Sequence, residues 1–357
     1  MAVERTPDGV RPTLGGMRRV LALVAAAAMI VGSITIRSRL DRGEEESARP
    51  LRVMCATELG TVCDTLRRTS AQVTVEPAAA TADRLGRSSG DDPGVDGWLA
   101  PAPWPQIVDG RRRQVGQDPL FGDVSAPLAR SPLALVVSRA LVDRLRTRCG
   151  PTIGWKCLGD AAAVTPPEAK PGHPDPSTDA FGVLLVGQAA AAWFGRSVDL
   201  STLDLDDPGF DRWLRALERA APAPVSGATR LNEMLGTNFA TYDAVGTIEA
   251  EALPVLNASA VSDRVTLLYP SPMATADVVL AGAGGDIARR LREVAGGDAV
   301  RRALAGAGWR VEGVTRTVDL PLPPTNGLPS PGFLGARAEG VEEPGGCLLY
   351  TSPSPRD

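Results

Sequence analysis

The chain has 357 residues, of which 43% are apolar and 22% are charged, as is ordinary for a folded globular protein. Its formal net charge is -4, so it has no overall positive field that would hold nucleic acid. His173 is the single histidine. A Ser-His-Asp or Cys-His catalytic arrangement would have to use it, and a zinc site would depend on cysteines or carboxylates. We therefore predict a protein that is not an enzyme and that uses no metal or cofactor.

An uncharged apolar run covers residues 20–36, with Arg18 and Arg19 before it and Arg37 after it. Its 17 residues are at the short end of the ~20 that a transmembrane helix needs. A cleaved secretory signal is the alternative, although no small-residue cleavage site precedes Arg37. Because arginines flank both ends, orientation is assigned from size, with the large domain outside the cytoplasm. The sequence thus predicts a single-pass protein of the cell membrane.

This interpretation divides the N-terminal part into three segments. They are a cytoplasmic stub (1–16), a transmembrane anchor or signal (17–37) and a charged linker (38–50).

Four cysteines form two local pairs with the same spacing. Cys55 and Cys63 are eight residues apart, as are Cys149 and Cys157. In an exported chain such pairs indicate disulfides, because the compartment is oxidising. Four cysteines allow three pairings, of which we favour the two local ones. Four buried free thiols are the alternative.

Short strands alternate with helices from residue 51 onward. Strands are predicted over 51–54, 73–75, 97–100, 133–137, 242–245 and 265–269. Helices are predicted over 59–69, 78–86, 140–148, 182–194, 211–221, 231–239, 287–294 and 298–307. This alternation predicts an α/β fold with a largely parallel sheet over residues 51–319.

Four segments in this order carry a family resemblance. They are LRVMCATE (51–58), DGWLAP (96–101), LARSPLALVV (128–137) and GHPDPSTDAFG (172–182). The chain resembles bacterial extracellular solute-binding proteins with the type II periplasmic-binding fold, in particular the branch that includes molybdate-binding proteins. The aromatic and hydroxyl residues that hold oxyanions in that branch are not reproduced, so its ligand class does not carry over.

The resemblance implies two α/β lobes that close like a hinge on a small solute. The expected partners are that solute and an ABC transporter permease or another envelope protein. An envelope interaction or sensor protein, which retains the fold without transport, is the alternative function. Helix N-termini at the carboxyl ends of the strands suit an anionic group.

Hydroxyl residues at three such turns are candidate ligand contacts, namely Thr57, Thr81, and the pair Ser177 and Thr178. Ser131, before Pro132 at the crossover between the lobes, is a further candidate. The resemblance adds Tyr242, which lies where the family often has a contact from the second lobe. Serine and threonine at helix starts also serve as N-caps, which is the ordinary structural role at such positions. Nothing in the sequence forms a nucleophile–base pair or a phosphate loop.

The C-terminal part loses helical and strand periodicity. Prolines dominate residues 320–346, which we interpret as a linker or as the start of a truncated C-terminal part. Residues 347–357 resemble a translated sequencing-adapter remnant and are left out of the fold prediction.

Overall fold

The computed structural model describes residues 49–69, 71–88, 94–150, 153–220, 229–314, 322 and 326–339. Nearly all of them belong to the second of two compact units, which covers residues 51–357. The predicted stub, the predicted anchor, most of the linker and the adapter-like tail lie outside the described residues.

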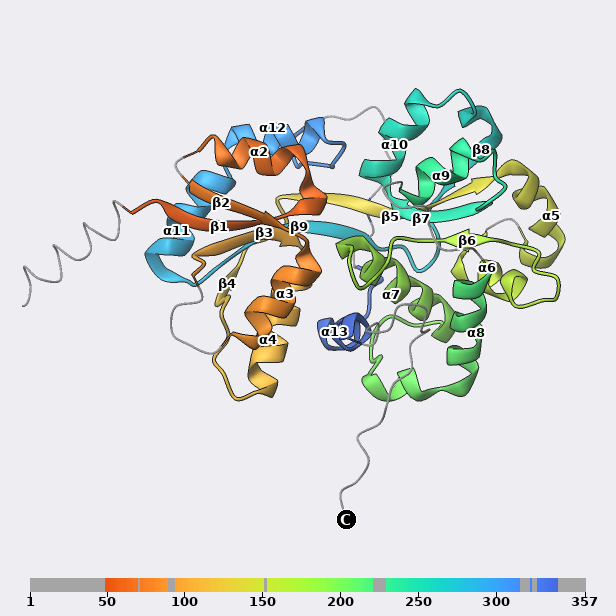
Figure 1. The fold of residues 1–357 in the computed structure, drawn as a ribbon, viewed down its shortest axis with the longest axis horizontal. Coiled ribbons are helices and arrows are strands. Elements are labelled where there is room, and N and C mark those ends of the chain that lie inside the picture. Colours follow the sequence, from red (N-terminus) through yellow and green to blue (C-terminus); the bar gives the residue numbers. More distant parts are fainter. Residues whose placement is uncertain are drawn as a thin grey trace, which may run out of the picture. The chain divides into compact units, whose positions relative to one another are not determined.

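Nine strands of the described chain form one sheet with the order β2-β1-β3-β9-β5-β7-β6, with β4 paired to β9 and β8 paired to β5 (Figure 1). The strands are β1 (Leu51–Ala56), β2 (Ala71–Glu76), β3 (Gly97–Pro101), β4 (Asp123–Val124), β5 (Ala129–Ser138), β6 (Pro171–Gly172), β7 (Ala244–Ile248), β8 (Val265–Leu268) and β9 (Thr275–Gly282). Strand β5 connects the two halves of this sheet. Its residues 129–132 pair with β9, and its residues 133–138 pair with β7 and β8.

Helices cover the sheet in two groups. The first half of the fold has α2 (Thr61–Arg67), α3 (Ala78–Arg87), α4 (Trp104–Gln114), α11 (Gly285–Ala295) and α12 (Asp298–Gly306) around β1–β4 and β9. The second half has α5 (Arg139–Cys149), α6 (Trp155–Ala162), α7 (Ala180–Phe194), α8 (Pro208–Arg219), α9 (Arg230–Gly236) and α10 (Glu249–Ala258) around β6–β8. Short 3₁₀ turns cover Thr57–Leu59, Thr202–Asp206 and Ser262–Arg264.

Two elements show why the sequence folds this way locally. The Leu133–Val137 part of β5 is fully buried, which matches its continuous run of β-branched and apolar residues. Helix α7 is apolar on all sides and is buried through Ala191. It begins at the N-cap Asp179 and ends at Gly195, whose positive φ of 67° permits the left-handed turn.

The α/β prediction is confirmed, but the expectation of a largely parallel sheet is wrong. Strand β1 is parallel to β2 and β3, and β6 is parallel to β7. All five remaining pairings are antiparallel, and β9 takes part in three of them. Strand β9 was not predicted from the sequence, because Asp277 interrupts its apolar run and prolines precede it.

The segment that follows residue 319 is more than a proline-rich linker. It contains α13 (Pro331–Glu339), whose Phe333 and Leu334 are buried. A Cβ added to Gly187 of α7 would lie 2.4 Å from Leu334 Cδ2, which shows how closely α13 packs on α7. This helix therefore belongs to the folded unit.

The predicted location in the cell membrane is corrected. Among the residues that the model describes, no helix has both the length and the apolar character needed to span a bilayer. The 17–37 segment, on which the prediction rested, lies outside those residues.

Both predicted disulfides are present. Cys55 is joined to Cys63 with a Cα–Cα distance of 5.8 Å, and Cys149 is joined to Cys157 with a Cα–Cα distance of 5.7 Å. The first links the end of β1 to α2, and the second links the end of α5 to α6.

We expect the Cys55→Ser/Cys63→Ser double variant to lose about 2–3 kcal/mol of unfolding free energy, because the bond closes a short loop in the unfolded chain. Urea unfolding of both proteins measures the difference, and peptide mapping without reduction checks the pairing. Alkylation of all four thiols before reduction would contradict the disulfide assignment.

Candidate functional site

Glu58 lies where β1 ends and connects two helix starts. The Ala180 N–H of α7 donates to Glu58 Oε1 at 2.9 Å, and the Ala78 N–H of α3 approaches the two carboxylate oxygens at 3.3 and 3.4 Å. Helix α3 belongs to the first half of the fold and α7 to the second (Figure 1). One carboxylate thus meets the positive ends of two helix dipoles from different halves.

The start of α7 is held by further groups. Asp179 accepts from Phe181 N–H at 2.7 Å and from Gly182 N–H at 3.3 Å, so it is a true N-cap. Trp104 Nε1 of α4 donates to the carbonyl of Ala180 at 3.3 Å. The preceding loop packs so closely that a Cβ on Gly182 would lie 2.5 Å from the Pro174 carbonyl oxygen, which explains the glycine.

Glu251, in the first turn of α10, is the third acidic group. Thr247 Oγ1, at the end of β7, donates to Glu251 Oε2 at 3.0 Å. Desolvation, together with the charges of Asp179 and Glu58, raises the pKa of Glu251 to about 7. Burial also raises the pKa of Glu58 and of Asp179, and the Asp179 charge adds to the shift of Glu58. We call Glu58, Asp179 and Glu251 the acidic cluster.

This cluster is not arranged as a metal centre. In the described ranges, no group of three or more histidine, cysteine, aspartate or glutamate side chains is placed to hold a metal ion. The local charge is negative, so the cluster suits a ligand with a positive or hydrogen-bond-donating group.

The raised pKa of Glu251 predicts a pH dependence of stability. Between pH 4.5, its ordinary pKa, and about 7, the folded chain holds more protons than the unfolded chain. The associated stability is complete below pH 4.5 and is lost as the pH rises through about 7. Because the Glu251 residue keeps contact with solvent, water screens part of this effect, and we expect a modest loss between pH 5 and pH 8.

Urea unfolding of the wild-type chain and of Glu251→Gln at both pH values measures this effect. The variant should lose less stability than the wild-type chain over the interval. Equal losses in the two proteins would contradict the assignment of the shift to Glu251.

Three of the predicted ligand residues lie beside the cluster in the chain. Thr57 is exposed and precedes Glu58, and Ser177 and Thr178 precede Asp179. Ser177 donates from its backbone N–H and its hydroxyl to Asp175 Oδ1, at 2.8 and 2.6 Å. The bond between Glu58 and Ala180 brings these two turns together.

Thr81 and Ser131 are placed in the interior instead. Thr81 donates its hydroxyl to Glu76 Oε2 at 2.8 Å, and Ser131 Oγ accepts from Ala250 N–H at 2.9 Å. Both side chains are fully buried. We interpret these two hydroxyls as structural, since each satisfies a partner inside the protein.

Tyr242 is also buried, with its ring against Gly172 and under the guanidinium of Arg230, 5.7 Å from the ring centroid. Its contacts lie within the second half of the fold. The ligand contacts predicted for Thr81, Ser131 and Tyr242 stay predictions, and we leave these residues out of the candidate site.

Glu58 and Glu251 were not among the residues predicted from the sequence. Glu58 closes the strand-and-turn segment LRVMCATE, so a carboxylate directly after a buried strand was a usable signal. The prediction named the neighbouring residue Thr57 instead. Glu251 follows a strand in the same way, two residues into α10.

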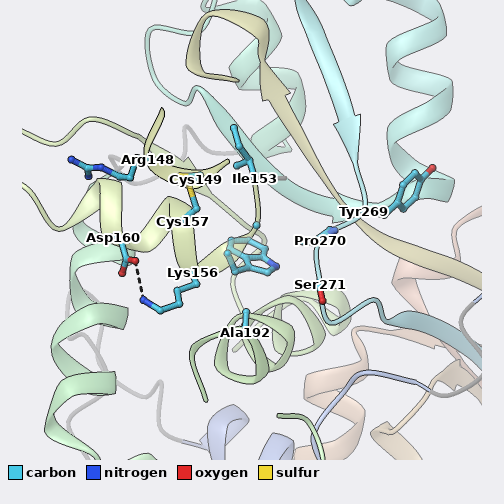
Figure 2. A pocket seen from close by; sticks show the side chains of 12 residues that line it. Arg148, Cys149, Ile153, Lys156, Cys157, Asp160, Ala192, Tyr269, Pro270 and Ser271 are labelled. Atoms are coloured by element: carbon cyan, nitrogen blue, oxygen red, sulfur yellow. Dashed lines mark hydrogen bonds and ion pairs between the residues drawn. A yellow bond between two sulfur atoms is a disulfide. The ribbon is translucent and has the colours of Figure 1, made fainter. Parts of the chain in front are cut away.

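A separate cavity of about 410 Å³ lies beside the Cys149–Cys157 disulfide (Figure 2). Trp155, Tyr269 and Ala192 line it, and Lys156 pairs with Asp160 at its edge with an Nζ–Oδ2 distance of 2.9 Å. It contains none of the predicted ligand residues and no member of the acidic cluster. We therefore place the candidate site at the acidic cluster.

No family model and no curated protein matches the sequence. Among solved structures, a periplasmic thiamin binding protein aligns with a TM-score of 0.53 at 13% identity, covering 81% of this chain and 92% of that chain. The Trichodesmium protein IdiA (FutA), solved with iron and citrate, aligns at 0.49 and 10% identity, covering 82% and 96%. The sulfate-binding protein SubI from Mycobacterium tuberculosis H37Rv aligns at 0.46 and 16% identity, covering 74% and 87%.

The likeness to the thiamin binding protein shows that the chain has the fold of periplasmic solute-binding proteins. The predicted fold is therefore confirmed at this level. This likeness does not single out the molybdate-binding branch.

Proposed function

We propose that the chain is an extracytoplasmic solute-binding protein that captures a small ligand between two lobes and presents it to an ABC transporter permease. The lobes correspond to the two halves of the fold that β5 connects. The observation that carries the proposal is the convergence of the β1 end with the starts of α3 and α7 on one carboxylate. In open α/β sheets, ligands bind at such carboxyl ends of strands.

We propose a ligand with a cationic group, and not an anion. The helix N–H groups that would receive an anion already donate to Glu58 and Asp179. Burial, followed by repulsion from Asp179 and Glu58, raises the pKa of Glu251 to about 7, and a positive charge would relieve the repulsion. The similar thiamin binding protein is named for a cationic ligand, which makes thiamin the first probe.

Thermal unfolding of the full chain, with its disulfides formed, tests this proposal. The panel comprises thiamin, spermidine, sulfate and molybdate. A ligand at ~100 times its Kd should stabilise the folded state by about 2.7 kcal/mol. We expect a cation to raise the unfolding temperature and the oxyanions to leave it unchanged.

Two charge-removing variants locate the binding site. Asp179→Asn keeps an N-cap acceptor for α7 but removes the charge. Glu251→Gln also removes a charge and keeps an oxygen that can accept from the Thr247 hydroxyl. Each should weaken cation binding by about tenfold, the equivalent of 1.4 kcal/mol. Asp160→Asn, beside the other cavity, is the matched control and should bind as the wild-type chain does.

Stabilisation by sulfate or molybdate would contradict the proposed cationic ligand. If a cation binds, and Asp160→Asn weakens this binding while Asp179→Asn and Glu251→Gln do not, the proposed site is wrong. If none of the four compounds changes the unfolding temperature of the folded protein, the alternative of an envelope interaction or sensor protein is favoured. The occupation of both helix starts by Glu58 is the observation that gives that alternative its support.

A further inference from the structure

The two helix starts that meet Glu58 have few acceptors of their own. Helix α3 begins after Pro77, which makes no side-chain cap, and its first turn contains no acidic residue. In α7 the Asp179 carboxylate caps Phe181 and Gly182, whereas the N–H of Ala180 donates to Glu58. Unpaired N–H groups at a helix start bind anions, because the dipole favours negative charge there.

Glu58 fills this position from within the chain. It is 20 residues before Ala78 and 122 residues before Ala180, so the bond to α7 connects distant parts of the sequence. Trp104 of the first half also donates to the carbonyl of Ala180. Both backbone groups of Ala180 are thus held by side chains of the first half.

We propose that Glu58 is an internal ligand: its carboxylate takes the place of a bound anion between α3 and α7 and latches the second half of the fold to the first. The contact is autoinhibitory toward free anions, since it occupies the N–H groups that they would need. This inference goes beyond the proposed function because it concerns the chain without any solute.

If Glu58 only capped α3, fewer effects of its removal would be expected. A carboxylate that only capped α3 would stabilise one helix in its own half, and its removal would leave α7 unaffected. A latch predicts two additional results when Glu58 is removed: a free carboxylate can enter the vacated position, and the two halves separate.

The experiment uses the full chain with its disulfides intact and the variant Glu58→Ala. We expect the unfolding temperature to fall by about 5 °C, because the carboxylate bonds at two helix starts are lost. Sodium acetate or propionate, at constant ionic strength against chloride, should restore part of this loss in Glu58→Ala. Neither should change the wild-type chain. Small-angle scattering should show a larger radius of gyration for the variant, and acetate should reduce it.

Glu76→Ala is the matched control. Glu76 is also a carboxylate beside α3, but its recorded bonds to Thr81 and Arg84 lie within the first half. It should lose stability without a change in the radius of gyration. If Glu58→Ala does not fold, Glu58→Leu takes its place, because leucine has no atom that can accept from Ala78 or Ala180. A larger radius of gyration than that of the wild-type chain is the expected result.

The latch is overturned if Glu58→Ala keeps the wild-type radius of gyration and gains nothing from acetate or propionate. It is also overturned if acetate stabilises Glu76→Ala and Glu58→Ala equally, since the effect would then not belong to this position. For Glu58→Leu, a wild-type radius of gyration overturns it. None of these outcomes depends on finding the solute, so the latch and the proposed function fail separately.

Discussion

Replacing Glu249 by leucine is expected to lower the free energy of unfolding by about 3–5 kcal/mol, the largest loss that we predict for a polar side chain here. Glu249 is fully buried at the start of α10. Arg310 donates from Nε to Glu249 Oε1 at 2.9 Å and from a second guanidinium nitrogen to Oε2. Tyr269 donates its hydroxyl to Oε2 at 2.6 Å. Removing the carboxylate leaves a largely buried guanidinium without its countercharge.

The Glu249–Arg310 ion pair lies beside the strand that connects the two halves of the fold. The backbones of Arg310 and Arg130 bond to each other in both directions at 2.8 Å, which places Arg310 beside the connecting strand β5. The Glu249 carboxylate raises the pKa of Arg310, as expected for a guanidinium that bonds a carboxylate. The same carboxylate contributes to a raised pKa of Tyr269, after the larger effect of burial.

Urea unfolding of Glu249→Leu and of the double variant Glu249→Leu/Arg310→Met measures the prediction. The double variant should regain much of the loss, because no buried charge is left unpaired. Asp143→Asn, which breaks an exposed pair with Arg146, is the control and should cost less than about 1 kcal/mol. A loss below that value for Glu249→Leu would refute the prediction.

Trp155→Ala is expected to cost about 3–5 kcal/mol, since it removes a large, fully buried side chain. The indole packs so closely on β7 that a Cβ added to Gly246 would lie 2.5 Å from it. Its Nε1 donates to Gln188 Oε1 at 3.0 Å, and Gln188 in turn donates to the carbonyl of Pro272 at 2.9 Å. The variant therefore loses packing and also leaves a buried amide oxygen without this donor.

Two further variants separate these causes by chemical denaturation. Trp155→Phe keeps an aromatic ring without the N–H, so it should lose less than Trp155→Ala. Val198→Ala changes a side chain that is 71% exposed and should be nearly neutral. If Trp155→Ala is as stable as Val198→Ala, the packing around Gly246 and Gln188 does not have the importance that we assign to it.

Local signals predicted most of the elements correctly. The run of apolar residues in β5 and the apolar helix α7 were both found near their observed bounds. Helix α4 was missed; it begins at Trp104, and Pro105 lies in its first turn, where proline is tolerated. Helix α10 was missed as well, and it contains Pro254 in its interior.

The candidate site was predicted only in outline. The polar turns after β1 and before α7 were predicted to contact a ligand, and the structure joins them through Glu58 and Ala180. Which side chain matters there was not predictable, because Thr57 and Glu58 are adjacent and only their orientation in the fold distinguishes them. Thr81 and Ser131 have suitable chemistry at plausible positions but are buried against internal partners.

The amino-acid order was enough to predict the α/β class, the two local disulfides and the absence of an overall basic surface, because alternation, spacing and charge are local or additive properties. The antiparallel insertion of β9, the docking of α13 and the bond from Glu58 to α7 were decided by the tertiary structure. Each depends on contacts between residues far apart in the chain, and such contacts leave no pattern in a single sequence.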